Sequence, residues 1–340
     1  MNPSLSNPMV SVVIRSYNRL SMVPELLEVC LSQDYANFEV VVVEQSENDL
    51  WEEYRASFER LDPRVRVIRS QPLGSAGAKN TGVLHSRGEI VLFIDDDDLP
   101  IGTTWISSHA KHYHDPLCVG VSGRCIKKPN ERVPYKNPDA AYDRCLTYSF
   151  FLRGRDLTGI DRPKKPVEWL HGMNASIRRS YVVALGGWYP YVTNIDEHSF
   201  CFKLRRALLP GEYLMFDPEP VVLRQFDIPG GLGKRYLTLN RVLVNHLQYY
   251  HWVVADYFPL RFYGLYPFFM IYNFRFATRW FRTFSHYSDS RWMRWFGMKV
   301  GRRLYILQEL VLYPVIVIRL LVQKKPDWSG QLDDIRPKPG

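Results

Sequence analysis

Apolar and polar residues alternate in blocks along the first 100 residues, and the blocks predict a regular succession of strands and helices. Four short runs are almost wholly apolar and rich in Val and Ile, at residues 10–14, 38–43, 65–68 and 89–94. Three intervening stretches carry apolar residues at helical spacing, at residues 22–31, 50–61 and 76–84. Continuously apolar strands that are separated by helices are typical of a parallel sheet covered on both faces. We therefore expect an α/β fold.

Acidic residues follow the fourth apolar run, at the edge where a parallel sheet binds ligands. Asp95, Asp96, Asp97 and Asp98 are consecutive. A cation would offset their mutual repulsion, and carboxylate oxygens suit Mg²⁺ or Mn²⁺. Because such ions usually share their ligands with a substrate phosphate, the run suggests a metal-bound nucleoside diphosphate. The alternative is an acidic loop at the start of a helix, where carboxylates are favourable.

A glycine-rich segment precedes the acidic run, at residues 74–82 (GSAGAKNTG). It has the spacing of neither a P-loop nor a GxGxxG motif. Small residues would let the backbone approach a nucleotide, and Lys79 could meet a ribose or a phosphate. An ordinary packed helix with an exposed lysine explains the segment about equally well.

The ordered series of motifs resembles that of family 2 glycosyltransferases, which have the GT-A fold. Residues 10–19 (VSVVIRSYNR) are similar to the VSVVIPTYNR opening of that family, residues 77–82 to its GxARNxG helix, and residues 94–100 (IDDDDLP) to its DXD-type LDADD…P metal motif. Residues 172–179 with Gly186, Gly187 and Trp188 resemble its acceptor-side segment. Asp196 and Glu197 stand where the family has its ED…RL helix. The resemblance covers roughly residues 9–226.

The resemblance implies how the donor and the metal are held. It places the base of a nucleotide-sugar near Tyr17 and Glu44, and its ribose near Asp95. It places the metal on Asp97, with Asp98 as a second ligand. The donor-binding residues that it implies are Tyr17, Arg19, Glu44, Lys79, Asp95 and Asp96.

The resemblance also implies a general base and an acceptor side. Glu197 aligns best with the base that takes the proton of the acceptor hydroxyl, although Asp196 is the alternative. Both could instead be acids that support a helix N-terminus. His171, Asn174 and Trp188 lie on the acceptor side, and for His171 we favour a structural role over substrate binding.

The chain departs from the family pattern at four places. Arg15 replaces the usual Pro at the end of the first strand, and Gln45-Ser46 replaces the usual turn after the second. The acid pair reads Asp-Glu rather than Glu-Asp. Arg224 stands where many members carry a metal-binding His. An arginine does not ligate a cation but can bind phosphate oxygens with two parallel hydrogen bonds, so we expect weaker metal affinity and a possible phosphate contact.

Charge and aromatic content divide the chain near residue 230. Residues 231–325 hold 15 Lys and Arg against three acidic residues, and 23 of the 48 aromatic residues. We therefore expect a catalytic domain at 1–230, a helical basic and aromatic region at 231–326, and a polar tail at 327–340. The longest uncharged runs there, 262–274 and 310–318, are shorter than the roughly 20 residues of a spanning helix.

This composition favours peripheral association with an anionic membrane surface, on its cytoplasmic face. A spanning helix and a soluble helical or oligomer-forming module are the alternatives. The first eight residues show no signal peptide. The five cysteines show no CxxC spacing, as expected in a reducing compartment. No nucleic-acid partner is expected, because no binding motif accompanies the basic residues.

These expectations combine into one function with two alternatives. The chain is expected to be an inverting glycosyltransferase that uses a UDP- or GDP-sugar donor and Mg²⁺ or Mn²⁺. Its acceptor would be a glycan or a lipid-linked molecule in cell-surface polysaccharide or glycolipid synthesis. The alternatives are a nucleotidyltransferase of related α/β architecture and a catalytically weak, membrane-bound assembly partner.

Overall fold

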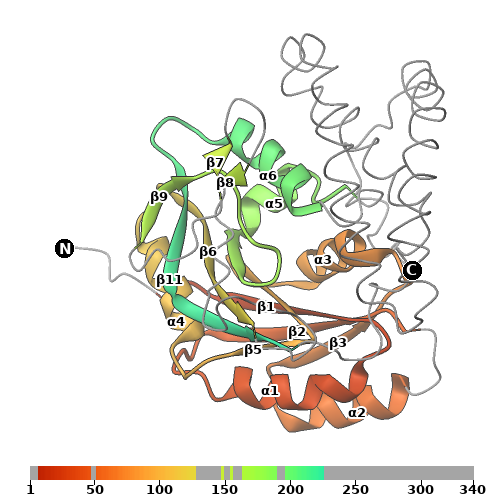
Figure 1. The fold of residues 1–340 in the computed structure, drawn as a ribbon. Helices are drawn as coiled ribbons and strands as arrows, with labels where there is room; N and C mark the ends of the chain where they lie inside the picture. The colour runs from red at the N-terminus through yellow and green to blue at the C-terminus, as the bar shows by residue number, and fades with distance from the viewer. Residues whose placement is uncertain are drawn as a thin grey trace, which may run out of the picture. The chain divides into compact units, whose positions relative to one another are not determined.

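The computed structural model describes residues 7–46, 51–127, 147–148, 154–155, 163–189 and 196–225, and a nine-stranded sheet organises them (Figure 1). The strand order is β3-β2-β1-β4-β10-β6-β11-β5, and β9 pairs with another part of β11. The predicted basic region (231–326) and polar tail (327–340) lie outside the described residues. Most of the segment 129–166 also lies outside them.

Four parallel strands form the first half of the sheet. They are β1 (Val10–Ser16), β2 (Phe38–Glu44), β3 (Val65–Arg69) and β4 (Ile90–Asp95). Each contains one of the four apolar runs, and β1 pairs in parallel with both β2 and β4. Between them run the helices α1 (Val23–Leu31, after the 3-10 turn Leu20–Met22), α2 (Trp51–Leu61) and α3 (Gly74–His85). The predicted α/β fold and these seven elements are confirmed.

The second half of the sheet is mixed, which the apolar pattern did not predict. The strand β10 (Ala175–Arg178) runs antiparallel to β4 and to β6 (Cys118–Lys127), whereas β11 (Tyr213–Arg224) is parallel to β6. The remaining described elements are β5 (Asp98–Pro100), α4 (Trp105–Ala110), a 3-10 turn (Lys111–His114), the paired strands β7 (Thr147–Tyr148) and β8 (Gly154–Arg155), β9 (Lys164–Val167), α5 (Arg179–Ala184) and α6 (Asp196–Ala207).

Alternating side chains of the central strands build two separate apolar layers. Val12 and Ile14 point to one face, where they join residues of α1, α2 and α4. Val13 points to the other, with residues of α3, α5 and α6. Figure 1 shows α1 and α2 below the sheet and α3, α5 and α6 above it. Gly82 allows α3 to approach β1, because a Cβ there would lie 2.3 Å from Cγ1 of Val13.

The strand register brings the polar strand ends together. Arg15 of β1 is paired with Asp95 of β4, and Ser16 is paired with Glu44 of β2. Across the other half, Arg224 at the end of β11 is paired with Asp98 of β5. The sheet therefore collects five of the residues singled out in the sequence at one edge: Arg15, Glu44, Asp95, Asp98 and Arg224.

The described helices and cysteines bear on two of the expectations from the sequence. Within the described residues, no helix has both the length and the apolar character needed to cross a membrane. The four cysteines in this part of the chain are buried and form no disulfide.

Candidate functional site

Three carboxylates of the acidic run converge to form a candidate metal site. One oxygen from each of Asp95, Asp97 and Asp98 lies within 4.8 Å of the other two. Asp98 is fully buried, and neither of its carboxylate oxygens has a hydrogen-bond partner among the described residues. Burial raises the pKa of Asp98, and the charges of Asp95 and Asp97 raise it further against the opposing charge of Arg224. Closely spaced oxygen ligands with unused acceptors fit a hard divalent ion.

Arginines surround the acidic run and compensate part of its charge. Arg19 is ion-paired with Asp97 at 2.8 Å and with Asp96 at 3.1 Å. Burial nevertheless raises the pKa of Asp96 to about 7. Arg224 lies farther from the carboxylates: its Nη2 atom is 3.4 Å from Oδ1 of Asp97 and 3.5 Å from Oδ2 of Asp95.

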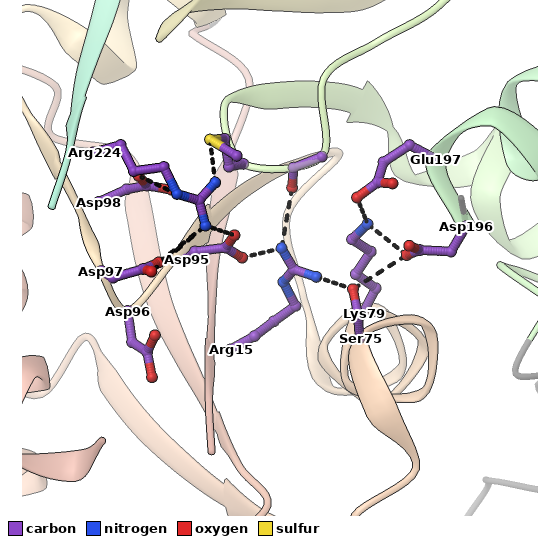
Figure 2. A network of polar contacts seen from close by, with 12 residues as sticks. Arg15, Ser75, Lys79, Asp95, Asp96, Asp97, Asp98, Asp196, Glu197 and Arg224 are labelled. Atoms are coloured by element: carbon purple, nitrogen blue, oxygen red, sulfur yellow. Dashed lines mark hydrogen bonds and ion pairs between the residues drawn. The ribbon is translucent and has the colours of Figure 1, made fainter. Parts of the chain in front are cut away.

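A second charged cluster joins α3 to the first turn of α6. The ammonium of Lys79 lies 2.8 Å from Oδ2 of Asp196 and 2.9 Å from Oε1 of Glu197 (Figure 2). The Lys79 side chain is only 1% exposed, so the alternative of a helix with an exposed lysine is wrong. Its role in donor binding stays a prediction, because in this structure its ammonium is directed to the acid pair.

The surroundings shift the pKa values of the two acids in opposite directions. Burial alone would raise the pKa of Glu197, but the charges of Lys79 and Arg15 overcome this effect and hold it below its usual value. Burial raises the pKa of Asp196, and the negative charge of Glu197 adds to the effect. The surroundings therefore favour the ionised form of Glu197 and disfavour that of Asp196.

Arg15 links the two clusters. Its guanidinium is ion-paired with Asp95, donates a hydrogen bond to Oγ of Ser75, and donates another to the Gly172 carbonyl at 3.3 Å. Ser75 in turn donates to Oδ2 of Asp196 at 3.2 Å. Figure 2 shows the resulting chain of contacts from the acidic run to the acid pair. Sequence reasoning noted Arg15 only as a departure from the family pattern. The available signal was a charged residue at the end of a central strand.

Predicted acceptor-side residues line a small cavity with Glu197. The walls of this cavity include Lys79, His171 and Trp188. The buried Trp188 ring stacks on Phe200, with 4.2 Å between the ring centroids. Gly172 leaves room for the carboxylate, because a Cβ at that position would lie 1.9 Å from Oε1 of Glu197.

The structure gives Asn174 a packing role. Its amide nitrogen donates to the carbonyls of Arg124 and Pro220, and its oxygen contacts Nε1 of Trp105 at 2.8 Å and Nε2 of His109 at 2.9 Å. Burial lowers the pKa of His109 to about 4, so the neutral ring can take part in this network. The side chain of Asn174 is thus engaged within the protein, and the sequence held no signal for these partners.

The predicted base-binding residues lie at the ends of β1 and β2. Tyr17 follows β1 and is 8% exposed, while Glu44 is fully buried at the end of β2. Burial raises the pKa of Glu44, although hydrogen bonds from Ser46 oppose this effect. The register of β1 with β2 and β4 places both residues at the same end of the sheet as Asp95, and Arg19 precedes the 3-10 turn that follows β1. Their individual donor contacts stay predictions.

The site thus combines three carboxylates near strand ends, Asp95, Asp97 and Asp98 (the acidic trio), with the acid pair Asp196 and Glu197, of which Glu197 lines a mostly apolar cavity. The sequence model of glycosyl transferase family 2 matches residues 11–186, just over half of the chain. The chain therefore belongs to glycosyl transferase family 2.

Relatives and solved structures agree with this assignment. The chain is 31% identical over 140 residues to the uncharacterized glycosyltransferase EpsJ of Bacillus subtilis, a match that covers 41% of this chain and 40% of EpsJ. It spans less than half of the curated relatives that it matches. Mannosyltransferase PcManGT from Pyrobaculum calidifontis, in complex with GDP-Man and Mn²⁺, has a similar fold (TM-score 0.51, 20% identity, 91% of this chain and 89% of that one). So does GalNAc-T7 with UDP, GalNAc and Mn²⁺ (TM-score 0.54, 16% identity, 71% and 48%). The expected GT-A fold is confirmed for the catalytic part.

Replacing the buried lysine tests the second cluster without any assay of transfer. We expect Lys79→Met to lower the free energy of unfolding by about 3–5 kcal/mol at pH 7, because it leaves the buried Asp196 and the partly buried Glu197 without their shared cation. The loss should shrink as the pH falls toward 4, since the carboxylates of the variant are then protonated in the folded state. Urea unfolding followed by tryptophan fluorescence measures both effects.

The matched control is the triple variant Lys79→Met, Asp196→Asn, Glu197→Gln, which removes the charges as well. It should recover most of the lost stability. An equal loss in the single and triple variants would mean that Lys79 acts through its aliphatic stem and not through its charge.

Proposed function

We propose that the chain is an inverting glycosyltransferase that transfers a sugar from a UDP- or GDP-sugar to an acceptor hydroxyl, with Glu197 as general base. The observation that carries the proposal is the position of the Glu197 carboxylate, which is held by Lys79 at the wall of a cavity. The acid pair is linked to the acidic trio through Ser75 and Arg15. GalNAc-T7 and PcManGT, which were solved with UDP and with GDP-Man, support the donor class.

The charges on this edge fit the chemistry of the reaction. The acceptor oxygen attacks the anomeric carbon while the bond from that carbon to the diphosphate breaks on the opposite side. The proton of the acceptor hydroxyl passes to the Glu197 carboxylate. Asp95, Asp97 and Asp98 would hold Mg²⁺ or Mn²⁺, which when bound stabilises the charge of the departing diphosphate.

The exposure of the two acids favours Glu197 over Asp196 as the base. The Glu197 side chain is 22% exposed and lines the cavity, whereas that of Asp196 is 3% exposed. Asp196 already accepts hydrogen bonds from Lys79 and Ser75. We therefore assign Asp196 to positioning Lys79, which in turn holds Glu197.

A panel of nucleotides tests the donor class and separates the alternatives. Ligands that bind only the folded state raise the melting temperature. A metal-dependent rise with one nucleoside diphosphate and its sugars, absent in Asp97→Asn, supports a transferase and identifies the base. A rise with triphosphates alone would favour a nucleotidyltransferase, and no rise with any nucleotide would favour a non-catalytic partner.

Replacing the base tests the mechanism. With the donor that the panel identifies, Glu197→Gln should lower the transfer rate by about 10²–10⁴-fold, because the amide cannot accept the proton. The donor-induced rise in melting temperature should persist. Asp196→Asn is the control and should lose less activity. Unchanged transfer in Glu197→Gln would refute this assignment.

Gly172 offers a test that replaces no charged residue. A methyl group in Gly172→Ala would displace the Glu197 carboxylate, so we expect the rate to fall by about 10²-fold or more. The melting temperature should change little, because the displaced group is the end of a flexible side chain. Adding Gly172→Ala to Glu197→Gln should cause almost no further loss. Additive losses would show that the glycine acts independently of the base.

We further propose that the acceptor is lipid-linked and that residues 231–325 bind the anionic cytoplasmic face of a membrane. The support is the composition of that region, which lies outside the described residues. The full chain should co-sediment with vesicles of anionic phospholipid, less so at high salt, and should not co-sediment with zwitterionic vesicles.

Charge-matched variants localise this binding. Replacing Arg291, Arg294 and Arg303 with Gln should weaken it, since each basic residue near the surface contributes about 1 kcal/mol. The control variant carries Gln in place of three exposed arginines of the catalytic domain: Arg55, Arg60 and Arg87. Equal losses in both triple variants would indicate an effect of overall charge and refute the proposed location.

A further inference from the structure

Arg224 lies within the acidic trio that is the candidate metal site. Its Nη2 atom is 3.4 Å and 3.5 Å from the two oxygens of Asp97 and 3.5 Å from Oδ2 of Asp95, and its Nε atom is 4.0 Å from Oδ1 of Asp98. Figure 2 shows the guanidinium directed at all three carboxylates. The register of β11 with β5 fixes this placement, because Arg224 is paired with Asp98.

A divalent ion bound to the trio would share its three carboxylates with this guanidinium. The three ligand oxygens lie within 4.8 Å of one another, and Mg²⁺ binds oxygen at about 2.1 Å. An ion held by them would thus lie within a few ångströms of a fixed positive charge. Repulsion at such distances costs several kcal/mol near a protein surface, so the ion and the guanidinium exclude each other from the trio.

The contacts of Arg224 are weaker than those of its neighbours. Its distances to the carboxylates, 3.4–4.0 Å, exceed the roughly 2.7–2.9 Å of strong charge-assisted hydrogen bonds. Arg19 reaches Asp97 at 2.8 Å. The other Nη atom of Arg224 donates to the sulfur of Met173, which is a weak acceptor. The guanidinium is therefore attracted by the trio without being locked to it.

We propose that Arg224 is an exchangeable internal cation. It neutralises the acidic trio in the absence of donor and moves to the diphosphate when donor and metal bind. Two parallel hydrogen bonds to phosphate oxygens replace its long contacts with the carboxylates, and the trio becomes available to the metal. This inference rests on the proposed function. Metal and nucleoside diphosphate must then strengthen each other's binding. The diphosphate draws Arg224 away from the carboxylates that the metal needs, and the metal displaces Arg224 toward the diphosphate.

Mn²⁺ binding tests the inference without measuring turnover. The signal of free Mn²⁺ in electron paramagnetic resonance would be titrated with the full chain, alone and with a saturating amount of the diphosphate that the nucleotide panel identifies. For the native chain we expect weak binding alone and an increase in affinity of about tenfold or more with the diphosphate. For Arg224→Gln we expect at least tenfold tighter binding of Mn²⁺ alone and a smaller increase with the diphosphate than in the native chain. The increase that remains comes from direct contact between the metal and the phosphates.

Two further variants keep the result interpretable. Arg224→Lys retains the charge without the planar fork, so it should bind Mn²⁺ alone as weakly as the native chain. Arg205→Gln removes an arginine that is ion-paired with Glu168 away from the trio, and it should behave as the native chain in both titrations.

The outcomes separate this inference from the proposed function. Binding of Mn²⁺ alone by Arg224→Gln that is no tighter than native binding would overturn it. If no variant bound Mn²⁺ with or without nucleotide, the metal site would be refuted together with this inference. Glycosyl transfer through Glu197 would still stand or fall by its own measurement.

Discussion

The compensation of buried negative charge is the constraint on which the site depends. Six carboxylates gather on one edge of the sheet, from residues 95–98 and 196–197, and four cations face them: Arg15, Arg19, Lys79 and Arg224. A buried charge without a partner is costly, so neither set would be stable without the other. The formal excess of two negative charges is the charge of one divalent ion. In the absence of that ion, burial raises the pKa of Asp96 and Asp98, which reduces the excess.

The architecture explains why these groups meet although they lie far apart in sequence. The ends of β1 and β4 carry Arg15 and Asp95, and their parallel register aligns the two residues. The antiparallel β10 follows the turn that contains Gly172, and α6 begins with Asp196 and Glu197. Helix α3 then supplies Lys79 from the layer above the sheet. Each cluster therefore needs elements from both halves of the fold, and the halves are joined where β10 pairs with β4.

The sequence allowed the first half of the fold and the types of residue at the site to be predicted, but not their partners. The apolar runs predicted β1 to β4 because continuous burial leaves a local signature. The sequence carries no comparable signature for β10, because its four residues are too few to show the alternation of apolar and polar positions. Lys79 was expected on the donor side or in solvent. Its contact with Asp196, 117 residues away, follows from how α3 and α6 pack on the sheet. Asn174 was expected near the acceptor, yet its amide is engaged by backbone and side chains that only the folded chain brings close.

The two arginine departures share a physical consequence. By the sequence resemblance, Arg15 replaces a Pro and Arg224 replaces a His of the family pattern, and each places a fixed positive charge beside Asp95. Both charges lower the pKa of Asp95, against the effect of burial. Yet the two residues are held differently. Arg15 is bound by Asp95, Ser75 and the Gly172 carbonyl, and its loss would disconnect the acidic trio from the acid pair. Arg224 has only long contacts to the trio. Of the two added cations, one is therefore suited to maintaining the geometry of the site and the other to moving within it.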